Sequence, residues 1–284
     1  MSEEVKREYK DTVFRMGAKI PENALSIYNA LNGTNYEDVG LIEFNTLENA
    51  IYMNVKNDVS FLIVGGVNLY EHQSTYTPNM PLRDLMYVAD LFQKYTKDKT
   101  IYLTKLVKLP TPHFVVFYNG TENQPEYMEQ RLSDSYEVHE DAPELELVVK
   151  IYNINPGMNE ELKARCPFLK EYTAYVQKVR FYSQTMDLKE AVERAVDECI
   201  KEGILREFLL NQKSEVVKMS IYEYDEEREM KLIRQGEREL GIEQGIVSSI
   251  KNLIRNTKVS MMDAMKMLGI PEEEKEKYMK MLGH

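Results

Sequence analysis

The sequence of 284 residues contains no tryptophan, only two cysteines and no long apolar run. A helix that crosses a membrane needs about 20 consecutive, mostly apolar residues, so we expect no transmembrane segment and no membrane partner. The charged residues 1–8 lack the apolar stretch of a secretory signal. Cys166 and Cys199 are too few for the disulfide framework of a small secreted protein. The sequence therefore predicts a cytoplasmic protein with reduced cysteines.

An excess of positive charge is also missing, because the formal net charge is −11. Proteins that coat nucleic acids depend on Lys and Arg to neutralise phosphates, and this composition argues against that class. The exception is a basic segment that is interrupted by a single acid, Asp98. Its lysines could contact phosphates or form a solvated helix end with a basic loop, and the sequence favours neither interpretation. They are Lys94, Lys97, Lys99, Lys105 and Lys108.

Apolar residues make up 43% of the chain, and 19 tyrosines and 9 phenylalanines supply large side chains. This content supports a hydrophobic core and excludes wholesale disorder. The length suits either one generous domain with an appendage or two small domains.

Two apolar runs flank Gly65-Gly66, which predicts a β-hairpin over residues 58–73 with its turn at these glycines. Asp58 then stands at the start of the first strand, and Glu71 and Gln73 stand at the end of the second. Residues two apart in a strand point to the same face, so Glu71 and Gln73 share one side and His72 points away.

Two carboxylates and an amide at the end of one hairpin form a hard-oxygen site suited to Mg²⁺ or Mn²⁺. A divalent ion held there could polarise a phosphodiester and activate a water. Acids at strand ends are more often simply solvated, so the spacing of Asp58, Glu71 and Gln73 leaves both interpretations open.

Other patterns predict the elements around the hairpin. Helical spacing indicates helices over residues 4–16 and 24–31, the second ending at Asn32-Gly33. A third helix begins near Pro81. Its predicted apolar face consists of Leu82, Leu85, Met86, Ala89 and Phe92. Unbroken apolar runs predict a buried strand over residues 113–118 and a further strand over residues 145–151.

No strand pattern appears after residue 160. Asp187 begins a helix with a clean apolar stripe that includes Cys199, which we interpret as a core residue. The sequence predicts a charged helical connector over residues 222–245. It also predicts a small helical unit over residues 247–284, with a helix that is capped at Ser260. A methionine-rich stripe in that unit has no evident partner within its own length. It favours self-association over DNA recognition by a helix–turn–helix.

Several ordered motifs resemble one bacterial family. They are EEVKREYKDTVF (3–14), IYNALNG (27–33), KNDVSF (56–61), LYEHQST (69–75), NMPLR (79–83) and PTPHFVVFYNG (110–120). Together they resemble the recombination-promoting nuclease (Rpn) or putative transposase family, within the PD-(D/E)XK nuclease superfamily. The resemblance covers nearly the whole chain.

The resemblance implies an α/β (α+β) fold: a restriction-endonuclease-like core with a mixed central sheet flanked by helices, plus an all-helical C-terminal extension. It implies a nuclease domain over residues 1–185, a helical connector over residues 186–246 and a C-terminal unit over residues 247–284. The implied activity is Mg²⁺- or Mn²⁺-dependent cleavage of DNA, linked to recombination or to mobile elements.

Carried over to this sequence, the motif makes Asp58 and Glu71 the metal-binding acids, and Gln73 stands where the superfamily has Lys. A neutral amide can orient water but supplies no positive charge. The acid on the first helix would be Asp11, or else Glu8, as a further metal ligand. DNA contacts are expected at Arg83, Lys94, Lys97 and Lys99.

The chain departs from the family pattern at two places. Gly17-Ala18 replaces large apolar residues on the first helix, and Val64-Gly65-Gly66 stands where an acid is common. These departures, with the acidic charge and Gln73, keep open a catalytically weak or inactive relative that works as a DNA-binding or oligomeric assembly module. A helical oligomerisation protein is a third interpretation, and homo-oligomers through the C-terminal helices are expected.

Overall fold

The computed structural model describes residues 12–45, 58–97, 101–102 and 104–282. The chain divides into two compact units between Tyr224 and Asp225, and each unit is described by itself. Among the described residues, none of the helices combines the length and the apolar character needed to cross a membrane.

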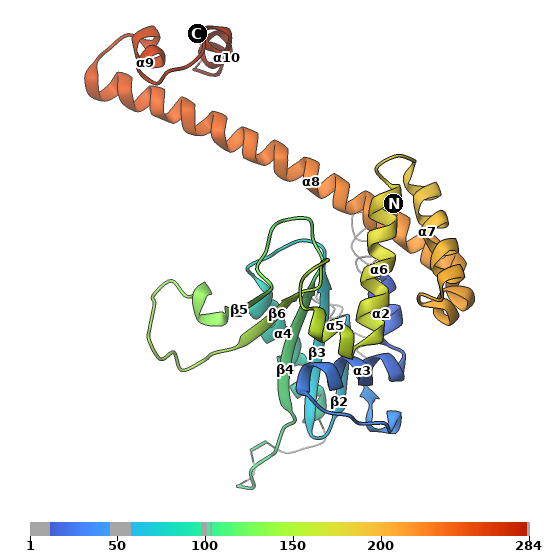
Figure 1. Ribbon diagram of the computed structural model, residues 1–284. Coiled ribbons are helices and arrows are strands. Elements are labelled where there is room, and N and C mark those ends of the chain that lie inside the picture. Colours follow the sequence, from blue (N-terminus) through green and yellow to red (C-terminus); the bar gives the residue numbers. More distant parts are fainter. Residues whose placement is uncertain (1–11, 46–57, 98–100, 103, 283–284) are drawn as a thin grey trace. The chain divides into compact units, whose positions relative to one another are not determined.

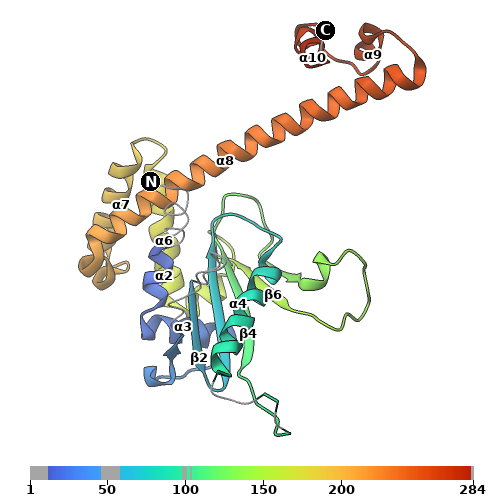
Figure 2. The same cartoon turned by 180° about the vertical axis from the view of Figure 1, so that it is seen from behind.

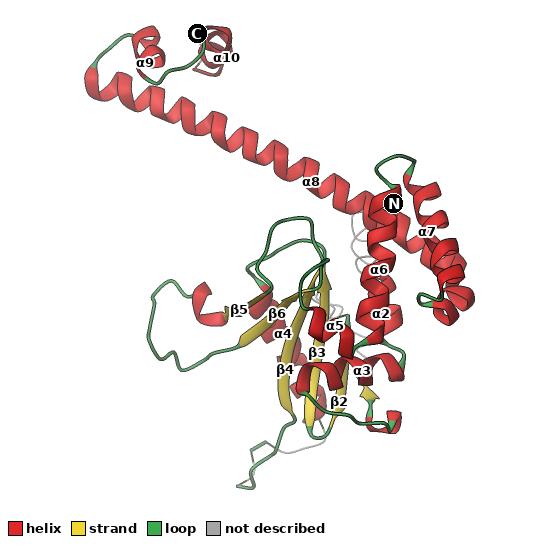
Figure 3. Cartoon of the chain, in the orientation of Figure 1, coloured by secondary structure: helices red, strands yellow, loops and turns green. Residues whose placement is uncertain are grey.

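The larger unit contains a mixed six-stranded sheet in the order β1-β2-β3-β4-β6-β5, flanked by helices (Figures 1 and 3). Strand β3 pairs with β4 in parallel, β4 pairs with β6 in parallel, and the remaining neighbours are antiparallel. The predicted mixed α/β architecture is therefore confirmed. The strands are β1 (Glu43–Phe44), β2 (Val59–Ile63), β3 (Gly66–Gln73), β4 (Thr111–Tyr118), β5 (Tyr127–Arg131) and β6 (Val148–Asn153).

The predicted hairpin is present as β2 and β3, and the predicted strand 113–118 lies beside it within β4. The turn is one residue earlier than expected, because Ile63 pairs with Gly66 and the two-residue loop is Val64-Gly65. Both loop residues have positive φ, 48° at Val64 and 76° at Gly65, as a tight hairpin turn requires. A β-branched residue in this conformation is strained, and Val64 carries that strain while Gly66 serves as a strand residue.

Helices precede, interrupt and follow the sheet. In chain order they are α2 (Thr12–Ala18), α3 (Pro21–Asn32), α4 (Met80–Tyr95), α5 (Glu160–Arg165), α6 (Pro167–Tyr182), α7 (Leu188–Glu202), α8 (Arg206–Thr257), α9 (Met261–Met267) and α10 (Glu272–Leu282). Two short 3₁₀ turns are η2 (Val39–Leu41) and η3 (Leu132–Ser135). Helix α3 ends at Gly33 in the left-handed conformation (φ 69°), as the sequence predicted.

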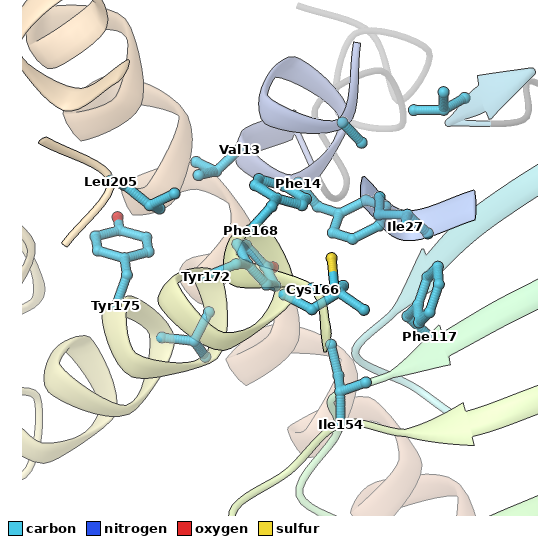
Figure 4. Close-up of a cluster of buried hydrophobic side chains, with 14 of the residues drawn as sticks. Val13, Phe14, Ile27, Phe117, Ile154, Cys166, Phe168, Tyr172, Tyr175 and Leu205 are labelled. Atoms are coloured by element: carbon cyan, nitrogen blue, oxygen red, sulfur yellow. The ribbon is translucent and has the colours of Figure 1, made fainter. Parts of the chain in front are cut away.

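The sheet separates two hydrophobic clusters because side chains alternate along its central strands. Leu69 and Val116 face α4 in one cluster, whereas Tyr70 and Phe117 face α2, α3 and α6 in the other. Helix α4 accordingly covers one face of the sheet, and the N-terminal helices cover the opposite face with α6 (Figures 1 and 2). The second cluster gathers aromatic side chains from α2, α6 and β4 (Figure 4).

The predicted apolar face of α4 is only partly correct, because Leu85 and Phe92 pack against the core whereas Leu82, Met86 and Ala89 are exposed. Leu82 and Met86 are 42% and 43% exposed, whereas Asp84 and Tyr87 are buried. The helix is turned because the end of β3 presents polar side chains, and α4 meets them with polar groups of its own. Hydrophobic periodicity carries no information on which strand residues a helix will face.

The later elements agree with the sequence prediction, apart from a shift in the bounds of one strand. The predicted strand 145–151 is present as β6, displaced toward the C-terminus. Asp187 caps α7 by accepting hydrogen bonds from the backbone of Lys189 and Glu190, and Cys199 is fully buried. Within the described residues, no strand follows β6.

The larger unit is longer than the predicted domain of residues 1–185, because α7 and the first part of α8 belong to its core. Val192, Val196 and Val216 are buried in the same cluster as the aromatic residues of α2 and α6. The smaller unit has a core of its own, in which Met265 packs with Ile250, Ala264 and Tyr278. Of the methionine-rich stripe, Met261 and Met265 thus find partners within the unit, contrary to the expectation, whereas Met262 and Met267 are exposed.

Gly17 explains how α2 packs against α6 although Gly17-Ala18 replaces large apolar residues. A Cβ atom at this position would lie 2.8 Å from Cζ of Phe168, closer than carbon atoms can approach without a shift. Phe14, one turn earlier, places its ring centroid 5.7 Å from that of Phe168 and 5.4 Å from that of Tyr172. The glycine therefore lets the ring of α6 press against the α2 backbone.

We expect Gly17→Ala to destabilise the larger unit by about 1–3 kcal/mol, because overpacking at Phe168 outweighs the better helix propensity of alanine. Urea unfolding followed by tyrosine fluorescence measures this loss. The matched control is Gly241→Ala in the smaller unit, where an added Cβ meets nothing within 4 Å, and it should leave the transition of the larger unit unchanged. A Gly17→Ala protein as stable as the natural one would contradict the proposed close contact.

Candidate functional site

The candidate site lies at the end of β3, on the face that meets α4. Gln73 Nε2 donates a hydrogen bond to Glu71 Oε1 at 3.1 Å, so the two side chains lie on the same side of the strand. Val59 pairs with Tyr70 across the hairpin, and the next step of this register places Asp58 opposite Glu71. Opposed residues of antiparallel strands have Cβ atoms roughly 5 Å apart. Asp58, Glu71 and Gln73 are each 8–9% exposed.

Asp58 is fixed to the neighbouring strand, because its Oδ2 accepts a hydrogen bond from the His72 backbone N–H at 2.8 Å. The His72 side chain points to the opposite face, as predicted. There its Nε2 lies 3.2 Å from the Tyr172 hydroxyl, and its ring stacks on Phe14 with centroids 5.2 Å apart. His72 is thus part of the core between the sheet and the N-terminal helices, and it does not contribute its side chain to the site.

Helix α4 supplies a cation. Arg83 Nη2 lies 2.7 Å from Glu71 Oε1 in a charge-assisted hydrogen bond. The Met80 sulfur accepts weak hydrogen bonds from Gln73 Nε2 at 2.7 Å and from Arg83 Nη1 at 3.3 Å. Gln73 and Arg83 therefore share two neighbours, the Glu71 carboxylate and the Met80 thioether.

A further acid is buried beside this group. Asp84 is 4% exposed, and its burial raises its pKa well above the usual range of a carboxyl group; the charge of Glu71 raises it further, while Arg83 opposes the shift. Burial also raises the pKa of the Tyr87 hydroxyl, with contributions from Asp90 and then from Asp58, Glu71 and Asp84. Among the described residues, the site thus holds more acid than base.

A second cation lies near Asp58. Burial and the neighbouring Arg15 lower the pKa of Lys19, whereas the negative charge of Asp58 acts in the opposite direction. Lys19 follows α2 directly, so the first helix brings positive charge toward the start of β2. The sequence analysis did not identify this residue.

The donor set suits a divalent ion in part. Within the described residues, no group of three or more His, Cys, Asp or Glu side chains is arranged to hold a metal ion, and Asp11 and Glu8 lie outside those residues. Asp58 and Glu71 are nevertheless two carboxylates that stand opposite one another by extension of the hairpin register. Mg²⁺ is usually held in this way, through one or two carboxylates with the remaining ligands from water and substrate phosphate. The pair therefore fits Mg²⁺, with Arg83 as its competitor at Glu71.

The residues expected to contact DNA do not lie together. Lys94 in the last turn of α4 forms an exposed ion pair with Asp90, with 3.3 Å between Nζ and Oδ2, and Lys97 is exposed. Lys99 lies outside the described residues. Arg83 is turned toward Glu71, and its side chain is 36% exposed.

Sequence reasoning missed Met80, Asp84 and Tyr87, which line the site together with Arg83. Their spacing follows one face of a helix, residues three and four apart. That helical spacing was the signal that could have found them. The sequence prediction took the buried face of α4 to be wholly apolar and therefore left out Arg83, Asp84 and Tyr87.

Comparison of the chain with protein-family models, with curated proteins and with solved structures found no match.

Burial of Asp84 should make stability depend on pH in a definite direction. A carboxyl group whose pKa is raised in the folded state stabilises the fold only while protonated, and this contribution is lost as pH rises from the ordinary value of 3.8 through the raised one. We expect Asp84→Asn, assayed in EDTA, to raise the melting temperature more at about pH 8 than at about pH 4. Differential scanning calorimetry measures both.

The control for this experiment is Asp141→Asn, since Asp141 is fully exposed and its replacement should shift neither melting temperature. An Asp84→Asn gain that is equal at the two pH values would show that Asp84 has an ordinary pKa.

Proposed function

We propose that this protein is a divalent-metal-dependent DNA endonuclease of the PD-(D/E)XK type, with a role in recombination or in mobile-element biology. The observation that supports it best is that Glu71 and Gln73 lie on one side of β3, with Asp58 expected opposite Glu71 by extension of the hairpin register. The resemblance of the ordered sequence motifs to the Rpn family points to the same chemistry.

Asp58 and Glu71 would hold the ion. When bound, Mg²⁺ or Mn²⁺ polarises a phosphodiester oxygen and lowers the pKa of a coordinated water. The backbone of His72 keeps the Asp58 carboxylate in place, and the pairing of β2 with β3 keeps it opposite Glu71. Both acids are therefore preorganised by the sheet, which holds catalytic groups more rigidly than a loop does.

In the proposed reaction, a water oxygen forms a new bond to phosphorus and the bond from phosphorus to the leaving sugar oxygen breaks. The water loses a proton to solvent, and the sugar oxygen gains one. Gln73 can orient the attacking water through its amide but cannot neutralise the charge that develops on the phosphate. Lys94 and Lys97, exposed at the end of α4, would contact the DNA backbone at some distance from the cleaved bond.

A specific observation favours a second candidate, a catalytically weak relative that binds DNA without cutting it. The Glu71 carboxylate is already neutralised by Arg83 at 2.7 Å, and an acid that is committed to an ion pair binds a metal ion less readily. The two candidates differ in whether a divalent ion can displace the guanidinium.

Plasmid nicking with Mg²⁺ or Mn²⁺ separates the two candidates. We expect the natural protein to nick supercoiled DNA and EDTA to abolish the activity. Asp58→Ala and Glu71→Ala should each lower the rate by about 100-fold or more, because each removes an anionic ligand that water cannot replace with the same position. The control, Glu129→Ala, removes an acid from β5 that is 35% exposed and pairs with Arg131, and it should keep the natural rate.

Nicking that survives EDTA, or that is unchanged in Asp58→Ala, would refute the endonuclease proposal. DNA binding without nicking by the natural protein would instead establish the second candidate.

We also propose that the smaller unit mediates self-association. Its part of α8 carries exposed apolar side chains, among them Ile233 and Leu240 at a spacing of seven residues. Apolar residues at this spacing form the seam between paired helices. The residue that follows at the same interval, Val247, is partly buried in the core of the unit, so the exposed seam would end where that core begins.

Replacement of Ile233 and Leu240 by Gln should lower the molar mass measured by light scattering from that of an oligomer to that of a single chain, while circular dichroism shows an unchanged helix content. Leu106→Gln is the control, because Leu106 is exposed in the larger unit. A natural chain that is monomeric at all concentrations would refute self-association.

A further inference from the structure

The candidate site lacks a cation at Gln73 but has one close by. Phosphodiester cleavage places additional negative charge on the phosphate oxygens, and sites that catalyse it supply donors or positive charge at that place. Gln73 is neutral and 8% exposed. The guanidinium of Arg83 lies one contact away, since both side chains bond to Glu71 Oε1 and to the Met80 sulfur.

Arg83 is placed so that it can change partners. Its side chain is 36% exposed, whereas that of Glu71 is 10% exposed, so the guanidinium lies at the border between the buried carboxylate and solvent. Its second contact is to a thioether, which is a weak acceptor. Within the described part of the chain, the bond to Glu71 is the strong contact of the guanidinium, and a competitor for Glu71 would release it.

We propose that Arg83 is the phosphate-binding cation of this site, held on Glu71 until a divalent ion takes that carboxylate. This inference rests on the proposed function of Asp58 and Glu71. A divalent ion carries twice the charge of a guanidinium and takes oxygen ligands. The released guanidinium has a planar fork of donors that matches two phosphate oxygens, and it remains charged at every pH at which proteins are folded.

The arrangement makes Arg83 a substitute for a cation at position 73. A Lys at that position would extend from the same strand as Glu71, whereas Arg83 reaches the same carboxylate from α4, which is packed on that face of the sheet. The charge that the strand does not provide is therefore supplied by the helix.

Two binding measurements with Arg83→Met test the proposal, because they should change in opposite directions. Calorimetric titration with Mn²⁺ in the absence of DNA should show about tenfold tighter binding, since one positive charge no longer competes for Glu71. Fluorescence anisotropy of a short DNA duplex in Ca²⁺ should show about tenfold weaker binding and a salt dependence that is smaller by about one phosphate contact.

Arg131→Met is the matched control. Arg131 is also an arginine in an ion pair with a glutamate, at 3.0 Å from Glu129 Oε2, but it lies on β5 with half of its side chain exposed. Neither affinity should change in this variant. Near-ultraviolet circular dichroism of Arg83→Met establishes that the fold is retained.

A rescue variant tests the exchange of roles directly. Gln73→Lys combined with Arg83→Met returns one positive charge to the site, and it should restore most of the DNA affinity that Arg83→Met loses. Gln73→Lys alone should be tolerated or should increase nicking.

A residue with a merely structural role would weaken both kinds of binding, and that result would overturn the proposal. Unchanged Mn²⁺ affinity or unchanged DNA affinity in Arg83→Met would also overturn it. Absence of any Mn²⁺ binding by the natural protein would refute the proposed function and this inference together. Mn²⁺ binding with the two opposite shifts but without nicking would uphold Arg83 as the phosphate-binding cation and refute only the endonuclease activity.

Discussion

Strand β3 is buried at all eight of its positions, and this burial constrains everything around it. A polar group that is removed from water must find a partner inside the protein or cost several kcal/mol. The end of the strand carries Glu71, His72 and Gln73, so both layers of helices must supply partners for these polar side chains. On one side His72 meets Tyr172 and Phe14, and on the other Glu71 and Gln73 meet α4.

The demand for partners also explains why α4 turns Met80 and Arg83 toward the strand and leaves Leu82 and Met86 exposed. Turning the helix to bury those two apolar residues would have left Glu71 without Arg83 and Gln73 without Met80. The cost of an uncompensated buried carboxylate exceeds the gain from burying one or two apolar side chains. The polar end of β3 therefore sets the rotation of α4, and the site and the fold are specified by the same contacts.

The charge of the site follows from this arrangement. Asp58, Glu71 and Asp84 lie on or beside one face of the hairpin, and Arg83 is a cation in hydrogen-bonding contact with Glu71. Acidic groups held at close range favour a bound cation, because each carboxylate raises the energy of ionising its neighbours. Burial is the main cause of the raised pKa of Asp84, the charge of Glu71 adds to it, and the Arg83 guanidinium opposes it.

The sequence by itself determined the local elements of this protein. The two apolar runs that flank Gly65-Gly66 were enough to predict the hairpin, although its turn lies one residue earlier. The unbroken run 113–118 was enough to predict the central strand beside it. Asp187, Gly33 and Ser260 marked helix ends correctly, because caps depend on interactions within a few residues. Glu71 and Gln73 were placed on one face, with His72 opposite, by the two-residue period of a strand alone.

Only the tertiary structure decided which surfaces meet. The rotation of α4, the inclusion of α7 in the core of the larger unit, the close approach of Phe168 to Gly17 and the pairing of Arg83 with Glu71 all join residues that are distant in sequence or lie on different elements. Gly17 looked like a loss of apolar bulk, and it is instead the position that admits a ring from residue 168. Such contacts depend on the shape and polarity of the opposite surface, which the local pattern of a single sequence does not contain.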